Sequence, residues 1–230
     1  MSRKIPRAGK IRLGTPKQAN RPGQNVGYFR VDSQSLPQAL VDQCLGTTQP
    51  DKLDVHFIRF FPDAKQSVDA IFDSSYQSWQ GSKRFCVGDG EKANRLSPEG
   101  IIEVACICPL LEQKKCKQTA VLKLGLCDLP MVGYWEVRSS SWSSIHQFSK
   151  VLDMYYAILG EDLFTTKFQL FKRQETVGER NPWVTHLNVH PDETAKLLAR
   201  MSVSNDPMIA PTVDELTLGP IDTDEVDIPF

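Results

Sequence analysis

Apolar residues repeat at helical spacing most clearly in the stretch 143–159. Five of them fall on one face of a helix with 3.6 residues per turn: Phe148, Val151, Leu152, Tyr155 and Leu159. Ser143 and Ser144 offer capping hydroxyls at the start of this stretch, and Gly160 follows it as a stop signal. The pattern therefore predicts an amphipathic helix that ends at Leu159.

Alternation of apolar and polar residues predicts strands elsewhere in the chain. The alternating segments are 53–57, 120–126, 134–138, 168–170 and 183–189. The last two flank a turn cluster and are expected to pair as a hairpin. Shorter helical patterns occur near 36–46, 68–72 and 192–201. Because strands and helices do not alternate regularly, we expect an α+β fold: a β-rich mixed domain with a few short helices.

Charge is distributed unevenly, although the formal net charge is only −1. Residues 1–30 carry eight bases and no acid, with one short apolar alternation at Ile11 and Leu13. After Arg200 there are seven acids and no base. The sequence thus predicts three regions: a basic N-terminal arm at 1–30 with at most one edge strand, an α+β core at 31–204, and an acidic disordered tail at 205–230.

The basic arm supplies the first set of candidate contact residues. They are bases that phosphates or an acidic partner would attract: Arg3, Lys4, Arg7, Lys10 and Arg12. A second interpretation stays open, in which both charged ends are simply solvated and raise solubility.

The start of the chain and its hydropathy predict where the protein works. No apolar run approaches the roughly 18 residues needed to span a bilayer, so no membrane association is expected. Residues 1–7 are basic but lead into Gly, Pro and Asn, unlike a secretory signal. We therefore expect a cytoplasmic protein whose six cysteines are thiols or metal ligands.

Four of the six cysteines lie close together in the segment 85–117, with the spacing C-x19-C-x-C-x7-C. They are the candidate ligands of a structural Zn²⁺, which prefers four thiolates in a closed tetrahedral site: Cys86, Cys106, Cys108 and Cys116. Gly88-Asp89-Gly90 permits a turn after the first cysteine, and nearby lysines would offset the charge of the site. We predict a zinc-knuckle-like insertion with four cysteine ligands here.

An alternative interpretation of the cysteines stays open. The four thiols can instead be small buried hydrophobes or a redox pair. The two remaining cysteines, Cys44 and Cys127, lie in apolar patterns and are predicted to be core thiols.

Candidate catalytic groups are sparse. The four histidines are scattered, and His186 and His190 fall on a strand, where residues four apart lie ~13 Å from each other. We expect them to be exposed or paired rather than metal ligands. Asp89 and Glu91 are two acids in a turn, which are usually solvated. No phosphate-binding loop or nucleophile motif is present, so we predict that the protein is not an enzyme.

Two aromatic features allow more than one interpretation. Tyr134 and Trp135 beside Arg138 can stack on bases, as can Trp142 in the serine-rich run. We favour structural roles, a core strand for the first pair and a packing contact at the helix entry for Trp142.

Several strings of the sequence stand out together: the opening 4–14, the cysteine-plus-GDG segment 85–90 with the polar pair Asn94-Arg95 after it, the cysteine strings 106–109 and 115–117, and the strings 129–137 and 140–145. As a set they resemble the recombination directionality factors that partner large serine integrases in actinophages. The likeness extends from residue 4 to about residue 190. Met131-Val132 and the acidic tail depart from the family pattern.

The resemblance implies an accessory protein of phage DNA recombination. Members of the family bind an integrase already seated on DNA, through its coiled-coil zinc domain, and shift it from integration to excision of phage DNA. Contact with DNA is then expected mainly through the integrase complex.

Two other functions remain open at this point. One is a zinc-stabilised nucleic-acid-binding module that uses the basic arm on phosphates, for which salt-dependent binding to naked DNA is the test. The other is a metal-dependent hydrolase of phage origin, whose activity chelators would abolish.

Overall fold

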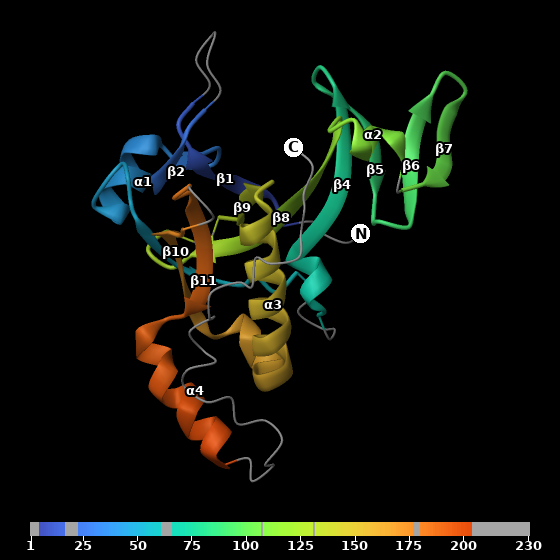
Figure 1. Ribbon diagram of the computed structural model, residues 1–230. Coiled ribbons are helices and arrows are strands. Elements are labelled where there is room, and N and C mark those ends of the chain that lie inside the picture. The colour runs from blue at the N-terminus through green and yellow to red at the C-terminus, as the bar shows by residue number, and fades with distance from the viewer. Residues whose placement is uncertain are drawn as a thin grey trace.

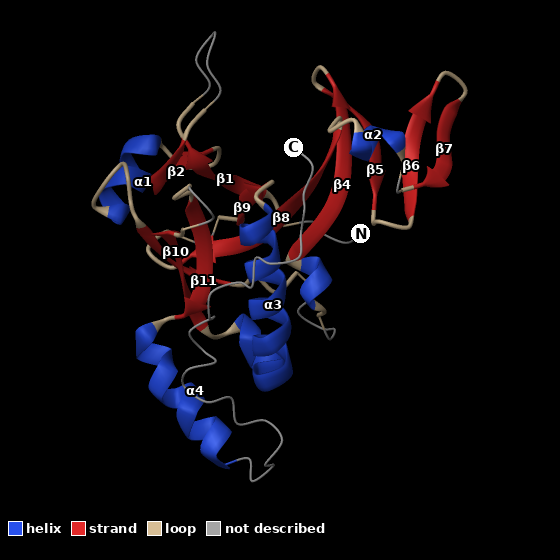
Figure 2. Ribbon diagram, in the orientation of Figure 1, coloured by secondary structure: helices blue, strands red, loops and turns tan. Residues whose placement is uncertain are grey.

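A curved sheet of eleven strands forms the framework of the protein (Figures 1 and 2). The computed structural model describes residues 5–16, 23–60, 66–106, 108–130, 132–176 and 180–203. Four α-helices and two short 3-10 helices accompany the sheet within these ranges. The predicted class, a strand-rich α+β fold with few helices, is confirmed.

The longest strand, β8 (Cys116–Leu126), lies in the middle of the sheet. One of its edges pairs with β9 (Tyr134–Ser139). Next to β9 lies β1 (Arg7–Gly14), which pairs with it in parallel, and then β2 (Asn25–Ser33), which pairs antiparallel with β1. On this side the sheet therefore ends at β2.

The other edge of β8 is shared by two strands, so that the sheet branches. The first part of β8 pairs with β4 (Phe72–Gln80), and its last two residues pair with β3 (Lys52–His56). Beyond β3 lie β10 (Lys167–Gln174) and β11 (Trp183–Val189), the predicted hairpin. Beyond β4 lie three short strands: β5 (Lys83–Gly88), β6 (Lys92–Ser97) and β7 (Gly100–Ala105).

Helix α3 (Trp142–Leu159) packs its apolar face on the sheet, and all five residues of the predicted stripe are buried. The Phe148 ring meets Phe72 of β4 edge-on, and the Tyr155 ring meets Phe168 of β10 in the same way. The helix begins earlier than predicted. Ser141 is its N-cap, because its carbonyl accepts from the Ile145 N–H, and the expected caps Ser143 and Ser144 lie in the first turn.

The other helical segments are short or peripheral. They are α1 (Gln38–Leu45), the 3-10 turns η1 (Val68–Ala70) and η2 (Gly160–Phe164), α2 (Pro109–Glu112) and α4 (Pro191–Val203).

Two regions of the molecule are distinct in Figure 1. The wing comprises residues 76–118: the paired ends of β4 and β8, the strands β5 to β7, and α2. It projects from the remaining described residues, which form the body around α3. The body holds one large apolar core, whereas the core of the wing is a cluster of three buried residues.

The described part of the predicted arm belongs to the sheet. β1 lies between β2 and β9, with Ala8 and Ile11 buried, and β2 buries Phe29 and Val31. The expectation of an arm with at most one edge strand is therefore wrong for these residues. The prediction failed because it followed the positive charge of this segment, whereas the apolar side chains of β2 are buried and hold the segment in the sheet. The rest of the arm and the acidic tail lie outside the described residues.

Two further predictions of secondary structure were wrong. The helix expected near 68–72 is only the turn η1, after which β4 begins at Phe72. Apolar residues at 68, 71 and 72 mimic helical spacing, but Ile71 and Phe72 pack into the sheet core. The segment 85–117 is no separate knuckle either, because its strands continue the main sheet from β4.

Candidate functional site

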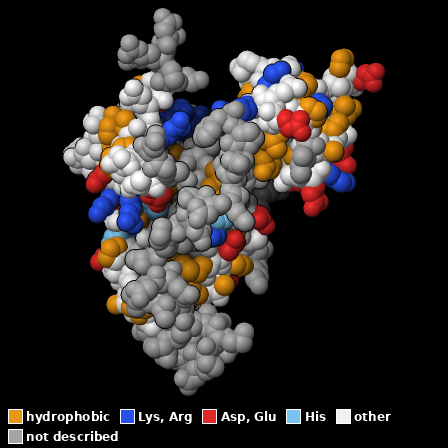
Figure 3. All heavy atoms as spheres, in the orientation of Figure 1, with side chains coloured by type: hydrophobic (Ala, Val, Ile, Leu, Met, Phe, Trp, Pro, Cys, Tyr) orange, Lys and Arg blue, Asp and Glu red, His pale blue; other side chains and the backbone are white. Residues whose placement is uncertain are grey.

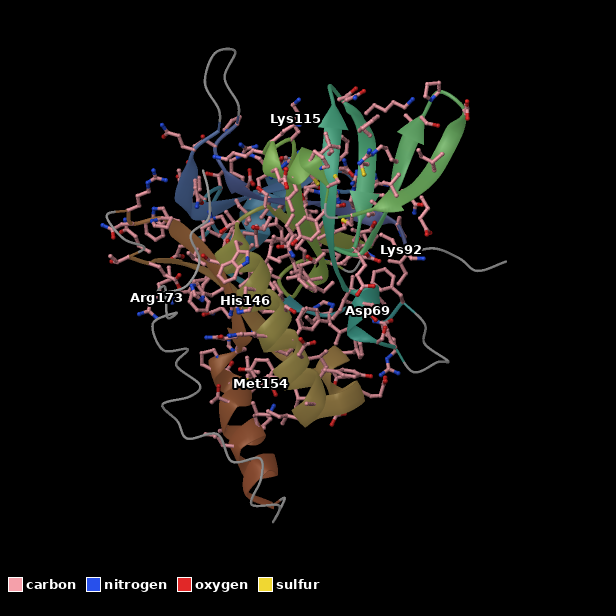
Figure 4. All side chains as sticks on the ribbon, turned by 45° about the vertical axis from the view of Figure 1, so that its right-hand side comes forward. Asp69, Lys92, Lys115, His146, Met154 and Arg173 are labelled. Atoms are coloured by element: carbon pink, nitrogen blue, oxygen red, sulfur yellow. The ribbon has the colours of Figure 1, made fainter. Side chains whose placement is uncertain are left out.

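Four cysteines that are up to 30 residues apart in sequence converge in the wing. Cys86 on β5 and Cys116 on β8 both pair with Ser78 of β4. Directly opposed residues of antiparallel strands point to the same face, so the two thiols flank Ser78 on one face of the sheet. Cys106 follows β7, and Cys108 is the N-cap residue of α2. Figure 4 shows sulfur atoms gathered in the wing near Lys115.

The backbone around Cys106 is closely packed. A Cβ on Gly88 would lie 2.5 Å from the Cys106 Sγ and 2.6 Å from the Lys92 carbonyl oxygen. The Cys106 N–H donates to the Glu91 carbonyl at 2.9 Å, which fixes the end of β7 to the turn between β5 and β6. The glycine of the G-D-G turn is therefore required for the thiol to fit.

The carboxylate of Asp89 stabilises this turn through hydrogen bonds with the backbone. Its Oδ1 accepts from the backbone N–H groups of Glu91 and Lys92, both at 2.8 Å. These hydrogen bonds hold the pKa of Asp89 below its ordinary value. Both acids are exposed, in agreement with the expectation that they are solvated.

Burial and the neighbouring thiols act together on Cys116. Burial raises the pKa of the Cys116 thiol, and the charges of Cys86, Cys106 and Cys108 raise it further. The other three sulfurs therefore lie within electrostatic range of Cys116. Arg95 on β6 brings an opposite charge into direct contact with this group, because its guanidinium Nη2 donates to the Cys108 Sγ at 3.4 Å.

The arrangement fits the chemistry of a tetrathiolate metal site but is not a preformed one. Four soft donors converge on one face, a glycine makes room for one of them, and the buried Nε of Arg95 has no partner. Yet no three His, Cys, Asp or Glu side chains in the described ranges are positioned to hold a metal ion. The structure thus does not show the predicted zinc knuckle, and ligation would require the sulfurs to move closer together.

Of the described residues of the basic set, Arg7 and Arg12 form ion pairs within the body. Arg7 donates to Glu136 at 3.1 Å, and Arg12 pairs with Asp32 at 2.9 Å. Burial opposes ionisation of Glu136, but hydrogen bonds from Arg7 and Arg138 hold its pKa below the ordinary value. Lys10 lies half-buried on β1. Arg3 and Lys4 lie outside the described residues.

Several other candidate residues have clear positions. His186 contacts Glu175 at 2.8 Å and His190 contacts Asp54 at 3.3 Å, so both are paired, which is one of the two expected alternatives. Trp135 is buried in the body, which confirms its structural role.

Trp142 makes a packing contact at the helix entry, as expected, because it stacks on His146 although it is 49% exposed. Two predictions about side-chain burial were wrong. Cys44 and Cys127 are both exposed and are not core thiols. Leu126 beside Cys127 is buried and Leu45 beside Cys44 is partly buried, but the two cysteines themselves lie at the surface.

The sequence segments that carry the family resemblance lie next to one another in the structure. β1 from the string 4–14 pairs with β9 from the string 129–137, and Gly9 lies opposite Trp135. A Cβ on Gly9 would come within 2.3 Å of the Trp135 ring, so this glycine is required for the contact. The three cysteine-containing strings meet in the wing.

Sequence reasoning missed two features of the wing. Arg95 stands out in the sequence only as part of a polar pair, and its contact with Cys108 depends on the pairing of β5 with β6. The adjacent pair Ile101-Ile102 is exposed on β7. A pair of isoleucines after the Pro98-Glu99-Gly100 turn was the available signal for an apolar strand at the surface.

Comparison with known proteins supplies the class of the protein. A family model described as Gp3-like, recombination directionality factor-like, matches residues 8–193. The match covers most of the chain, and the chain belongs to this family of phage DNA recombination proteins. The family implies interaction with a recombinase. No curated protein and no solved structure matches the chain.

The helices within the described ranges were also compared with the requirements of a bilayer. None of them is both long and apolar enough to serve as a membrane span.

Proposed function

We propose that this protein is a non-catalytic recombination directionality factor that binds a large serine integrase and switches it from integration to excision. The observation that carries this proposal is the family match over residues 8–193. We further propose that it acts in the bacterial cytoplasm, contacts the coiled-coil zinc domain of the integrase, and reaches DNA mainly through the integrase complex.

The proposed switch is a shift in population between two arrangements of the integrase. A partner that binds the excision-competent arrangement better by ~3 kcal/mol changes the balance about a hundredfold. Such a partner needs an interaction surface rather than a catalytic centre. Two surface hollows in the described part of the chain are open to solvent and share Asp73 and Ser74, which suits surface contact more than enclosure of a small substrate.

The test is an in vitro recombination assay with the large serine integrase encoded in the same genome. Adding the protein should suppress recombination of attP with attB and promote recombination of attL with attR. Heat-denatured protein is the matched control. No change in either reaction would contradict the proposal.

The second part of the proposal is a structural Zn²⁺ on Cys86, Cys106, Cys108 and Cys116. The wing has too few buried apolar residues to hold its three short strands by burial alone, and a metal is a common substitute in such small cores. The donor set and the Arg95 contact support this assignment. Zinc would supply a rigid cross-link and hold the thiols ionised, with no chemical step of its own.

Elemental analysis of the purified protein tests the zinc proposal directly, with one zinc per chain expected. Cys108→Ser should release the metal and lower the melting temperature, whereas Cys44→Ser, at an exposed cysteine outside the wing, should do neither. Protein that folds with no stoichiometric zinc would contradict this part and leave the recombination proposal intact.

A further inference from the structure

The sheet has three free ends, and two of them are covered. At the β2 end, the Phe29 N–H donates to the Pro50 carbonyl at 2.7 Å. The Gln38 side chain accepts from the Ser33 N–H at 3.1 Å and donates to the Val31 carbonyl at 2.8 Å. Three of the outward backbone groups of β2 are therefore already paired.

The β11 end is covered by side chains of α3. The Ser144 hydroxyl accepts from the Thr185 N–H at 3.2 Å. The Gln147 amide exchanges two hydrogen bonds with the Leu187 backbone, each at 3.2 Å, in the manner of a neighbouring strand. Such coverage is how proteins prevent an edge strand from pairing with another chain.

The third end, β7, has no such cover. Within the described residues, no hydrogen bond reaches Ile101–Ala105 from any element other than β6. Alternate N–H and C=O groups of an edge strand point away from its neighbour. β7 contains no proline, no lysine and no register shift, and its one charged residue is Glu103.

Both faces of β7 are apolar at the edge. Ile101 is 74% exposed and Ile102 is 43% exposed, on opposite faces of the strand. Ile102 pairs with Arg95, which itself pairs with Cys86, so Ile102 lies on the face that carries the thiols. A strand added here would cover both isoleucines. Figure 3 shows hydrophobic side chains on the outer side of the wing, with acidic side chains beside them.

The charged residues near β7 indicate which kind of partner strand would bind at this edge. Glu99 and Glu103, on the turn before β7 and on β7 itself, are both exposed. Lys92 of β6 pairs with Glu103 at 3.0 Å and Arg95 of β6 contacts Cys108, and no ion pair of Glu99 is found among the described residues. The edge therefore keeps a negative charge, which a strand with Lys or Arg would complement.

From these observations we infer that β7 is the docking edge for the recombinase. The occupant is an extended segment of the recombinase that adds to the sheet and carries apolar residues alternating with Lys or Arg. This inference rests on the proposed function, because it names the surface through which that function is exerted.

Charge also argues against a second copy of this chain as the occupant. Antiparallel pairing of two β7 strands about Ile102 would bring the two copies of Glu103 to diagonal positions, about 7–8 Å apart. Like charges at that separation in a sheet are unfavourable. A partner strand with Lys or Arg would instead pair favourably with Glu103.

The experiment measures binding of the purified integrase to the full-length protein by calorimetry or surface plasmon resonance. Ile101→Lys should weaken binding about tenfold or more, because an exposed apolar anchor is replaced by a charge. Glu99→Lys should weaken it less and reduce its salt dependence. Leu40→Lys, at a 39% exposed leucine on α1 of the body, is the matched control and should bind as the unaltered protein does.

Hydrogen exchange gives a second, independent measurement. Amides of Ile101–Ala105 should exchange more slowly when the integrase is added, whereas those of the covered strand β11 should not change. Circular dichroism of Ile101→Lys should match the unaltered protein, because the side chain lies in solvent.

The outcomes separate the two proposals. If the unaltered protein switches recombination but Ile101→Lys binds the integrase equally well, the docking edge is wrong and the proposed function stands. If the unaltered protein neither binds nor switches the integrase, both are wrong. A dimer in sedimentation that Ile101→Lys dissociates would also overturn the inference, because a second copy would then occupy the edge.

Discussion

The body and the wing are parts of one sheet, yet they are held together differently. Among the described residues, the body core contains 27 buried apolar residues, five of them on α3, whereas the wing core contains Cys86, Ala93 and Cys106. The sheet of the wing also buries the polar side chains of Gln77 and Ser78. Burial therefore stabilises the body, and the wing needs another source of stability.

The difference has a functional consequence. A region with little apolar burial opens more easily than the rest of the molecule, and regions that bind partners are often of this kind. In the wing the same residues that lack a large core also present the uncovered edge β7. We therefore expect metal and partner to stabilise the wing, and neither to be needed for the body to fold.

The largest expected effect on stability comes from a substitution in the core of the body. Trp135→Ala removes a fully buried indole that contacts Gly9 and should lower the free energy of unfolding by about 3–5 kcal/mol. Urea denaturation followed by fluorescence and circular dichroism measures it. A loss below about 1 kcal/mol would mean that the body core is not the main source of stability.

The next effect concerns Lys172, a buried lysine that links β10 to β1 and β2 of the body. The Lys172 ammonium of β10 donates to the Leu13 carbonyl, to the Val26 carbonyl at 2.6 Å and to Asn25 Oδ1 at 3.0 Å. Lys172→Met leaves these oxygens without their donor and should cost about 1–3 kcal/mol. An unchanged urea midpoint would contradict this.

The same lysine predicts a dependence on alkaline pH. Burial lowers the pKa of Lys172 to about 8, below the value of 10.5 expected for the unfolded chain. Between these values the unfolded state binds more protons, so this group adds stability as the pH rises from about 8. Stability curves of the unaltered protein and Lys172→Met should therefore move apart in this range, because only the unaltered protein gains stability. Parallel curves would show that the lysine is not shielded from water.

A smaller and local effect is expected in the wing. Cys86→Ser places a hydroxyl where a buried thiol packs on Ala93 and Cys106, and should ease opening of the wing by about 1–2 kcal/mol. Amides of Lys92–Leu96 should then exchange faster, while those of β1 keep their rates. Equal acceleration in β1 would show that the two regions unfold as a single unit.

The smallest effect is a dependence on mildly acidic pH. Burial lowers the pKa of His56 in the folded body below the ordinary value of 6.5. The unfolded chain therefore takes up a proton first, and this group's contribution to stability is lost as the pH falls from about 6.5 toward the folded pKa. His56→Gln should reduce the loss seen in urea denaturation between about pH 7 and pH 5. The same loss in both proteins would assign it to other groups.

Local patterns were sufficient to predict much of the body. The helix α3, its buried stripe, and the strands β3, β8, β9, β10 and β11 follow from periodicities of 3.6 and 2, which the chain shows without reference to its neighbours. The same rules failed at residues 68–72, where an apolar pattern too short to define its period led into β4. They failed again at 1–30, where positive charge outweighed the apolar residues of β2.

The amino-acid sequence by itself determined the α+β class, the main elements of the body, the group of four cysteines and the family strings, because each depends on residue type and short spacing. Only the tertiary structure decided that β1 enters the sheet beside β9, that Arg95 lies at Cys108, and that β7 is the end of the sheet left uncovered. Strand order brings together residues far apart in the chain, and no local pattern encodes which edge stays without a neighbour.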